Sequence, residues 1–150
     1  MAPVLSLDAF PGNSANTVMR ELAIAYQTVV SFDAGALKRF DLTPPQADVI
    51  VSLGHRPGQS CRELSDSTLI NRGSLSSILD RLESRRLITR ALSRTDRRKT
   101  VIRLTARGSD LLDRLEPERS AHIASRLEQI DVGKQGMIVD SLRTLQRVFQ

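Results

Sequence analysis

Residues 71–105 read NRGSLSSILDRLESRRLITRALSRTDRRKTVIRLT, and this stretch decides the fold. Its first part has apolar residues at positions 75, 78, 79 and 82, a helical spacing that predicts a helix with one buried face. Two β-prone runs follow, joined by an arginine-rich turn, and they predict a hairpin. Between Arg81 and Arg107 the chain has ten Lys or Arg and two acidic residues, a local charge of +8, whereas the whole chain carries +5. The positive charge is therefore concentrated on the helix end and the hairpin.

The composition indicates a globular domain that binds a polyanion. The chain has 150 residues, of which 40% are hydrophobic and 26% charged, as expected for one domain of ordinary size. Aromatic residues make up only 3%, so the core is expected to be aliphatic. A pI near 10.3 with a localised basic stretch favours a polyanionic partner. A membrane surface is the competing polyanion, but no basic stretch here carries a large exposed apolar face.

Capping residues, prolines and glycines divide the rest of the chain into helices. Residues 1–12 are expected to form a flexible N-terminal tail. The expected helices span about 13–40, 43–54, 60–67, 71–86, 105–128 and 131–149. Pro117 is expected to kink or interrupt the fifth of these, because proline removes a backbone donor. The first helix is apolar around much of its circumference, which indicates packing beyond its own domain.

A short helix, a brief turn, a helix with a polar outer face and a basic hairpin follow one another in this chain. That order is typical of a winged helix-turn-helix, in which the second helix enters the major groove of DNA. We therefore predict a mainly α fold with a small two-stranded β wing, flanked by N- and C-terminal helices. Arginines at the hairpin tip suit phosphates or a narrow minor groove.

Two motifs lie in and after this segment. Residues 79–83 read LDRLE and residues 87–90 read LITR. Asp96 and Arg98 form Asp-x-Arg, followed after five residues by Leu104, Thr105 and Gly108 in the order Leu-Thr-x-x-Gly. Together the motifs resemble those of the MarR family (multiple-antibiotic-resistance regulators), bacterial winged-helix repressors that bind DNA as dimers. The resemblance covers residues 13–149.

The resemblance implies that the chain has a DNA-binding domain and a separate dimerisation region. Residues 43–104 would form the winged helix-turn-helix DNA-binding domain, and residues 13–42 and 105–150 a helical dimerisation region. A homodimer would place two recognition helices about 34 Å apart on a palindromic operator in double-stranded DNA. The residues expected to contact DNA are Arg72, Ser74, Ser76, Ser77 and Arg81 on the helix and Arg94, Arg97 and Arg98 on the wing. Asp96 would pair with a neighbouring arginine and stabilise the wing.

Two positions depart from the family pattern. Ser77 stands where many relatives have a larger polar or basic residue, so direct reading of bases would be weaker. Arg86 stands where many relatives have glycine at the end of the recognition helix. Arginine adopts the left-handed C-cap conformation poorly, so this helix is expected to end differently.

The resulting functional prediction is a homodimeric transcriptional regulator, most often a repressor, that is relieved by a small-molecule effector or, less favoured, by an oxidant. Tyr26 and His55 are candidates for lining an effector pocket, although ordinary packing or exposure explains either residue. Cys61, at a helix start beside Arg62, is a possible redox residue, with a small semi-buried side chain as the simpler reading. The alternative function is a winged-helix module that binds RNA or an acidic protein without an effector switch.

Other classes of protein are disfavoured by the sequence. It has no phosphate loop, nucleophile elbow or convergent acid–base pair, so we expect no enzyme activity and no cofactor. His55 and His122 lie far from other ligand-type residues, so no metal site is predicted. One cysteine excludes an internal disulfide framework. Without an apolar run of membrane-spanning length or a signal peptide, the chain is expected to be cytoplasmic and not bound to a membrane.

Overall fold

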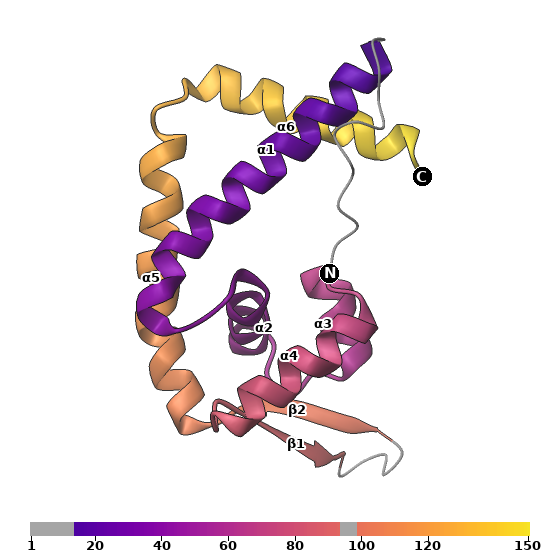
Figure 1. The fold of residues 1–150 in the computed structure, drawn as a ribbon. Helices are drawn as coiled ribbons and strands as arrows, with labels where there is room; N and C mark the ends of the chain where they lie inside the picture. Colours follow the sequence, from indigo (N-terminus) through magenta and orange to yellow (C-terminus); the bar gives the residue numbers. More distant parts are fainter. Residues whose placement is uncertain (1–13, 94–98) are drawn as a thin grey trace.

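The structure is a computed structural model that describes residues 14–93 and 99–150. Its elements are α1 (Ser14–Leu37), η2 (Lys38–Phe40), α2 (Pro44–His55), α3 (Cys61–Thr68), α4 (Arg72–Ser84), β1 (Ile88–Leu92), β2 (Thr100–Leu104), α5 (Ala106–Leu127) and α6 (Val132–Val148). Figure 1 shows α2, α3, α4 and the two strands gathered in one lobe, with α5 running from this lobe to α6 and with α1 and α6 crossing at the far end. The predicted mainly α fold with a two-stranded hairpin is confirmed. The predicted N-terminal tail lies outside the described residues.

The helix starts follow the local signals in the sequence. Thr43 and Gln46 form a capping box at α2, and Ser60 and Glu63 form another at α3. Hydrogen bonds from Ser60 to the Glu63 carboxylate hold the pKa of Glu63 below its ordinary value. The α2 helix continues to His55, so the expected end at Gly54 is one residue early. Terminal residues of helices are the least certain part of such predictions, because helix ends fray.

The lobe is built around an aliphatic core, as the scarcity of aromatic residues predicts. On α4, Leu75, Leu79 and Leu82 are buried and Ile78 packs against them, so the predicted stripe is confirmed. The buried apolar residues are Leu37, Leu42, Ala47, Val49, Ile50, Leu53, Leu64, Leu75, Leu79, Leu82, Leu87, Ile88, Ile102, Leu111 and Leu115. Because Leu111 and Leu115 belong to this core, the first half of α5 is anchored in the lobe.

The α5 helix continues through Pro117 from Ala106 to Leu127, so the expected interruption does not occur. Proline removes one backbone donor, but neighbouring contacts can hold the helix together. Before the proline, Leu115 is fully buried in the lobe. After it, Arg119 forms ion pairs with Asp33 of α1 and Asp48 of α2. Tertiary contacts on both sides therefore outweigh the local preference.

The end of α4 corrects a second expectation. Arg86 adopts the left-handed conformation, with φ of 58°. The sequence predicted a different helix end, because arginine disfavours this conformation. The N–H of Arg86 donates to the carbonyl of Glu83 at 2.8 Å, and that of Leu87 to the carbonyl of Leu82 at 3.0 Å. These two bonds form a Schellman motif. The motif leads the chain directly into the buried Leu87 and Ile88, whose packing compensates for the backbone strain.

Replacing Arg86 by glycine should therefore raise the free energy of unfolding by about 1 kcal/mol, because glycine adopts the left-handed conformation without strain. Urea denaturation followed by circular dichroism measures this change. Arg86→Ala is the matched control, since it removes the same side chain but keeps the strain. If Arg86→Ala stabilises the protein as much as Arg86→Gly does, the backbone is not the cause.

The strands pair antiparallel, with Ile88 opposite Leu104 and Leu92 opposite Thr100. A third segment joins the sheet, because Gln59 and Ile102 exchange both backbone hydrogen bonds, at 3.1 and 2.7 Å. No strand was predicted between the expected helices at 43–54 and 60–67. The buried Gln59 side chain also donates to the carbonyls of Ser52 and Arg56, at 2.7 and 2.9 Å. This residue thus connects the end of α2 to the wing strand β2.

Candidate nucleic-acid interface

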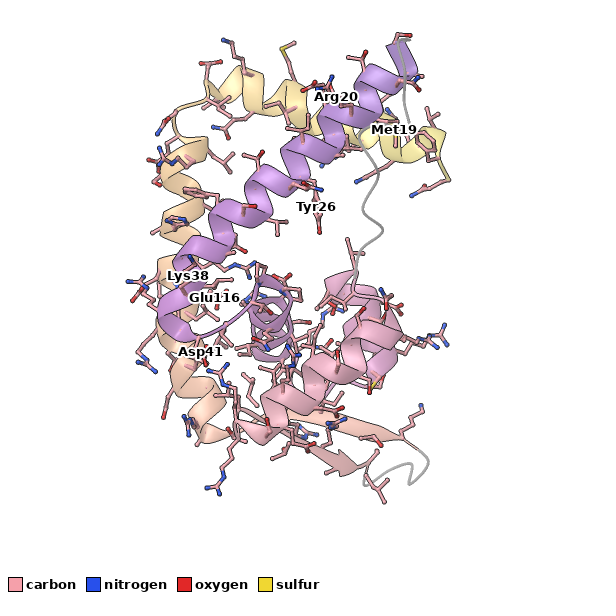
Figure 2. The ribbon with its side chains drawn as sticks, viewed as in Figure 1. Met19, Arg20, Tyr26, Lys38, Asp41 and Glu116 are labelled. Carbon is pink, nitrogen blue, oxygen red and sulfur yellow. The ribbon has the colours of Figure 1, made fainter. Side chains whose placement is uncertain are left out.

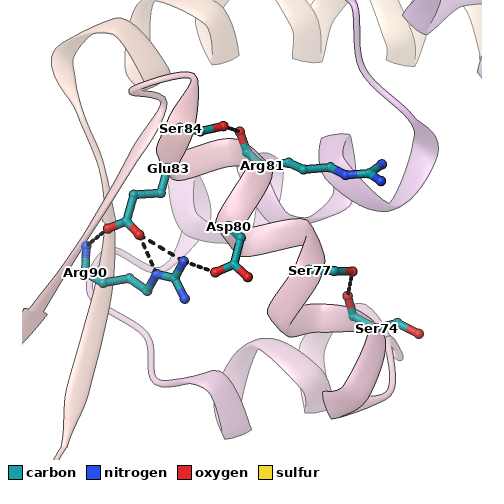
Figure 3. A network of polar contacts seen from close by, with 7 residues as sticks. All are labelled: Ser74, Ser77, Asp80, Arg81, Glu83, Ser84 and Arg90. Carbon is teal, nitrogen blue, oxygen red and sulfur yellow. Dashed lines mark hydrogen bonds and ion pairs between the residues drawn. The ribbon is translucent and has the colours of Figure 1, made fainter.

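The outer face of α4 presents small polar side chains near the start of the helix. Asn71 caps the helix by accepting from the N–H of Ser74 at 2.9 Å. Ser76 and Ser77 are exposed and Ser74 is half-buried, opposite the leucines of the core. The Ser77 hydroxyl donates to the Ser74 carbonyl at 2.9 Å (Figure 3). Together with the exposed Arg72, these residues form a polar face at the start of α4, as expected for a helix that enters the major groove.

Arg81 lies further along α4 and extends to the side opposite Arg90 (Figure 3). It lines a groove of about 430 Å³ between the end of α4 and the start of α2, together with Lys38, Asp41 and Arg85. Arg85 is held there by the carbonyls of Asp41 and Phe40. The predicted DNA-contacting residues of α4 therefore lie in two places, with Arg72 and the three serines at the start of the helix and Arg81 toward its end.

Arg90 of β1 braces the wing against α4, a role that the sequence analysis missed. Its Nε donates to Glu83 Oε2 at 2.9 Å, and its Nη2 pairs with both Asp80 and Glu83 (Figure 3). The hydrogen bonds that it donates to Asp80 and Glu83 raise the pKa of Arg90 above its ordinary value, although burial opposes the shift. The brace compensates two negative charges on the helix that is predicted to approach phosphates. The signal was present in the LDRLE and LITR motifs, which contain all three residues.

The base of the wing is closed by a hydrogen bond from the N–H of Ser93 to the carbonyl of Lys99 at 2.8 Å. The predicted DNA clamp (Arg94, Arg97 and Arg98) and the predicted wing-stabilising Asp96 lie outside the described residues. Their roles stay predictions.

The candidate effector residues lie in different places. His55 ends α2 and lines a groove of about 400 Å³ with Asp48, Ser52, Arg56, Leu69 and other residues of α2 and α3. Its Nε2 lies 2.6 Å from Glu116 Oε1 on α5. Tyr26 is exposed and points from α1 toward the lobe (Figure 2), but it does not line this groove.

Cys61 is exposed at the first position of α3, so it is not the semi-buried residue of the simpler reading. Its redox activity stays a prediction. Within residues 14–93 and 99–150, no cluster of three or more His, Cys, Asp or Glu is arranged to hold a metal ion. In the same part of the chain, no helix is both long and apolar enough to cross a membrane.

Comparison with known proteins agrees with this geometry. Residues 40–99 match the model of the MarR family. The HTH-type transcriptional regulator MhqR of Bacillus subtilis is 27% identical over 122 residues, covering 81% of this chain and 84% of MhqR. The structure is similar to Bordetella bronchiseptica BpsR, whose DNA binding is regulated by 6-hydroxynicotinic acid, with a TM-score of 0.77, 25% identity and coverage of 87% and 98%. It also shares the fold of a mutant Escherichia coli MarR in complex with operator DNA, with a TM-score of 0.80, 19% identity and coverage of 89% and 99%.

Proposed function

We infer that the chain is a MarR-family winged helix-turn-helix transcriptional regulator, a DNA-binding protein and not an enzyme. From this premise we propose that it acts as a homodimeric repressor at a near-palindromic operator. A small-molecule effector would relieve the repression. The observation that carries the proposal is the exposed polar face of α4, which Arg90 holds in a fixed relation to the wing.

In this proposal α4 enters the major groove and the wing contacts the flanking backbone. Ser76 and Ser77 would reach base edges, where hydroxyls discriminate weakly because they both donate and accept. Arg72 and Arg81 would approach phosphates or guanine edges from the two ends of the helix. Much of the sequence preference would then come from DNA shape and deformability.

The homodimer is supported by α6, none of whose residues is buried in the single chain. Its exposed apolar residues are Val132, Met137, Ile138, Val139, Leu142 and Val148, continued by Phe149. Ile130, Met137, Ile138 and Leu142 line a groove of about 580 Å³ that is almost wholly apolar. Continuous apolar surface of this kind is typical of a protein interface. A second copy of the chain is the proposed occupant.

The effector proposal is supported by the groove at His55. Two of its residues, Asp48 and His55, are tied to α5 through Arg119 and Glu116. A ligand in this groove would compete with those contacts and favour a geometry that does not match DNA, provided that it binds this state more tightly. The regulation of BpsR by 6-hydroxynicotinic acid shows that a small ligand can control a similar protein. An oxidant acting at the exposed Cys61 is the other proposed trigger.

Selection of bound duplexes from a random DNA pool tests the function directly. We expect the selected DNA to contain two inverted half-sites about one helical turn apart, and analytical ultracentrifugation to give the mass of a dimer. Selection of RNA in a parallel experiment, with no enriched duplex, would instead favour the alternative function.

Replacing both Arg97 and Arg98 with alanine should weaken binding to the selected duplex by about a hundredfold at 150 mM salt. The reason is that a dimer would lose four phosphate contacts, which should also flatten the slope of log Kd against log salt by about 3 to 4. Fluorescence anisotropy at several salt concentrations measures both quantities. The matched control is alanine at Arg114 and Arg126, two exposed cations of α5 that belong neither to the wing nor to the proposed dimer helix α6. An unchanged slope in the wing variant would remove the wing from the mechanism.

A further inference from the structure

The middle of α5 forms a joint between the lobe and the long helices. On one side of Pro117, Leu111 and Leu115 are part of the lobe core. On the other side, α5 packs against the end of α1 and continues toward α6 (Figure 1). Proline cannot donate the backbone hydrogen bond expected at this point of a helix, so the helix has one internal hydrogen bond fewer here. Side-chain contacts around Pro117 therefore have a large share in setting the angle between the two parts.

One arginine connects three helices at this joint. The guanidinium of Arg119 donates to both carboxylate oxygens of Asp33 in α1, from Nε at 2.9 Å and from Nη2 at 2.6 Å. The same Nη2 lies 2.7 Å from Oδ1 of Asp48 in α2. The Arg119 side chain is only 17% exposed and that of Asp33 only 7%, whereas that of Asp48 is 39% exposed. The Asp33–Arg119 pair thus holds α1 to α5, and Asp48 adds the connection to the lobe.

Two more exposed side-chain contacts lie beside this cluster. Glu116 pairs with His55 at the end of α2, and Glu118 pairs with Arg39 of η2. Figure 2 shows Glu116 on α5 close to the turn between α1 and α2, where Lys38 and Asp41 lie. All of these side chains are 40% exposed or more, so water and salt screen them. The contact from Arg119 to Asp48 is the most sheltered link between α5 and α2 in this set.

The composition of the cluster favours a role in geometry over one in stability. Asp33 alone balances the charge of the guanidinium through a bidentate pair, and a second carboxylate gives the cluster a net charge of −1. Buried ionic groups are weak evidence for stability and are in some proteins retained because they specify one arrangement. In a dimer, a small rotation of the lobe at this joint would move α4 relative to the twofold axis.

We propose that the Arg119–Asp48 contact determines operator specificity, because it holds the lobe at one angle to the long helices and thereby sets the half-site spacing that the dimer accepts. This inference rests on the proposed homodimeric repressor. Neither residue needs to touch DNA, so both act as positioning residues. Asp33 keeps Arg119 in place when Asp48 is removed, which makes the lobe connection separable from the rest of the cluster.

The test compares the affinity of wild type and Asp48→Ala for the selected operator and for duplexes with one or two base pairs inserted or removed between the half-sites. Two base pairs change the separation of the half-sites by about 7 Å and their relative rotation by about 70°. Wild type should lose at least about tenfold in affinity on the altered duplexes. Asp48→Ala should bind the original operator only a few-fold more weakly and lose less than about threefold on the altered ones. Asp113→Ala, at an exposed aspartate of α5 outside the cluster, should keep the wild-type profile.

Two outcomes would overturn the inference. One is an Asp48→Ala variant that weakens binding by the same factor at every spacing, which is the result of a merely structural role. The other is a wild type that tolerates all spacings equally. If Asp48→Ala is not folded by circular dichroism, Asp48→Asn provides the same comparison with the side-chain volume kept. A wild type that binds a single half-site as well as a pair would instead contradict the homodimer proposal, and the two failures are therefore distinguishable.

Discussion

Replacing Gly108 with alanine is expected to lower the free energy of unfolding by about 3 kcal/mol, because there is no room for the added methyl group. A Cβ at this position would lie 2.1 Å from the carbonyl oxygen of Leu87 and 3.2 Å from Cδ2 of Leu104. The Leu87 carbonyl cannot move away easily, since it also accepts the N–H of Thr105 at 3.0 Å. Leu87 itself is fixed by the Schellman motif that ends α4. Relief of the clash therefore requires a shift of the backbone where α4, β1 and α5 meet.

Chemical denaturation measures this loss, and Gly136→Ala is the matched control. Gly136 is an exposed residue of α6, and a Cβ there would meet no other atom within 4 Å. The same substitution should raise stability there by about 0.5–1 kcal/mol, because alanine is the better helix former. Opposite signs at the two positions would show that close packing, and not the loss of glycine, is responsible. A Gly108→Ala protein as stable as wild type would contradict the close approach.

Gly108 also illustrates which parts of the fold the sequence could reveal. The helix starts at Thr43, Ser60 and Asn71 could be predicted because a cap and its partner lie within three residues of each other. The buried stripe of α4 and the hairpin follow from periodicity in the same way. The Leu-Thr-x-x-Gly motif was recognisable as a pattern, but the need for glycine depends on Leu87, a residue 21 positions earlier that folding brings into contact.

Three features that were missed or mistaken from the sequence depend on tertiary contacts. The isolated β-bridge at Gln59 forms because the edge of β2 at Ile102 that faces away from β1 is free to pair with it. Arg86 accepts a strained conformation because the following residues are buried. Pro117 does not interrupt α5 because the helix is held on both sides. In each case local propensity is worth about 1–3 kcal/mol, which packing of a buried segment can exceed.

Only part of the candidate interface could be predicted from the sequence, because the rest of it depends on tertiary contacts. The exposed serines of α4 follow from helical periodicity, since the opposite face is apolar. The Arg90 brace needs strand β1 to return beside α4, so only the order of the motifs hinted at it. The cluster at Arg119 joins residues 86 and 71 positions apart and has no local signal.

Replacing Arg119 with methionine is expected to lower the free energy of unfolding by about 3–5 kcal/mol, because it leaves the Asp33 carboxylate buried without its partner. Burial lowers the pKa of Arg119, but the hydrogen bonds to Asp33 and Asp48 outweigh this effect and leave its pKa above the ordinary value. The guanidinium is therefore charged in the folded protein at any pH used for the measurement. Methionine keeps much of the volume of the arginine side chain, so the substitution leaves little cavity. The loss of unfolding free energy therefore comes mainly from the lost charge interaction.

The double variant Arg119→Met with Asp33→Asn should recover most of this loss, since a neutral amide in place of the carboxylate removes the unpaired buried charge. Urea denaturation of the wild type, both single variants and the double variant completes a thermodynamic cycle, in which we expect a coupling energy of about 2 kcal/mol or more. Arg62→Met is the control, because Arg62 pairs with Asp66 on the exposed surface of α3 at 4.0 Å and should change stability by less than about 1 kcal/mol. If the changes in unfolding free energy at Arg119 and Asp33 are additive, the two side chains do not stabilise each other. The cluster would then lose its role in holding α1 and α5 together.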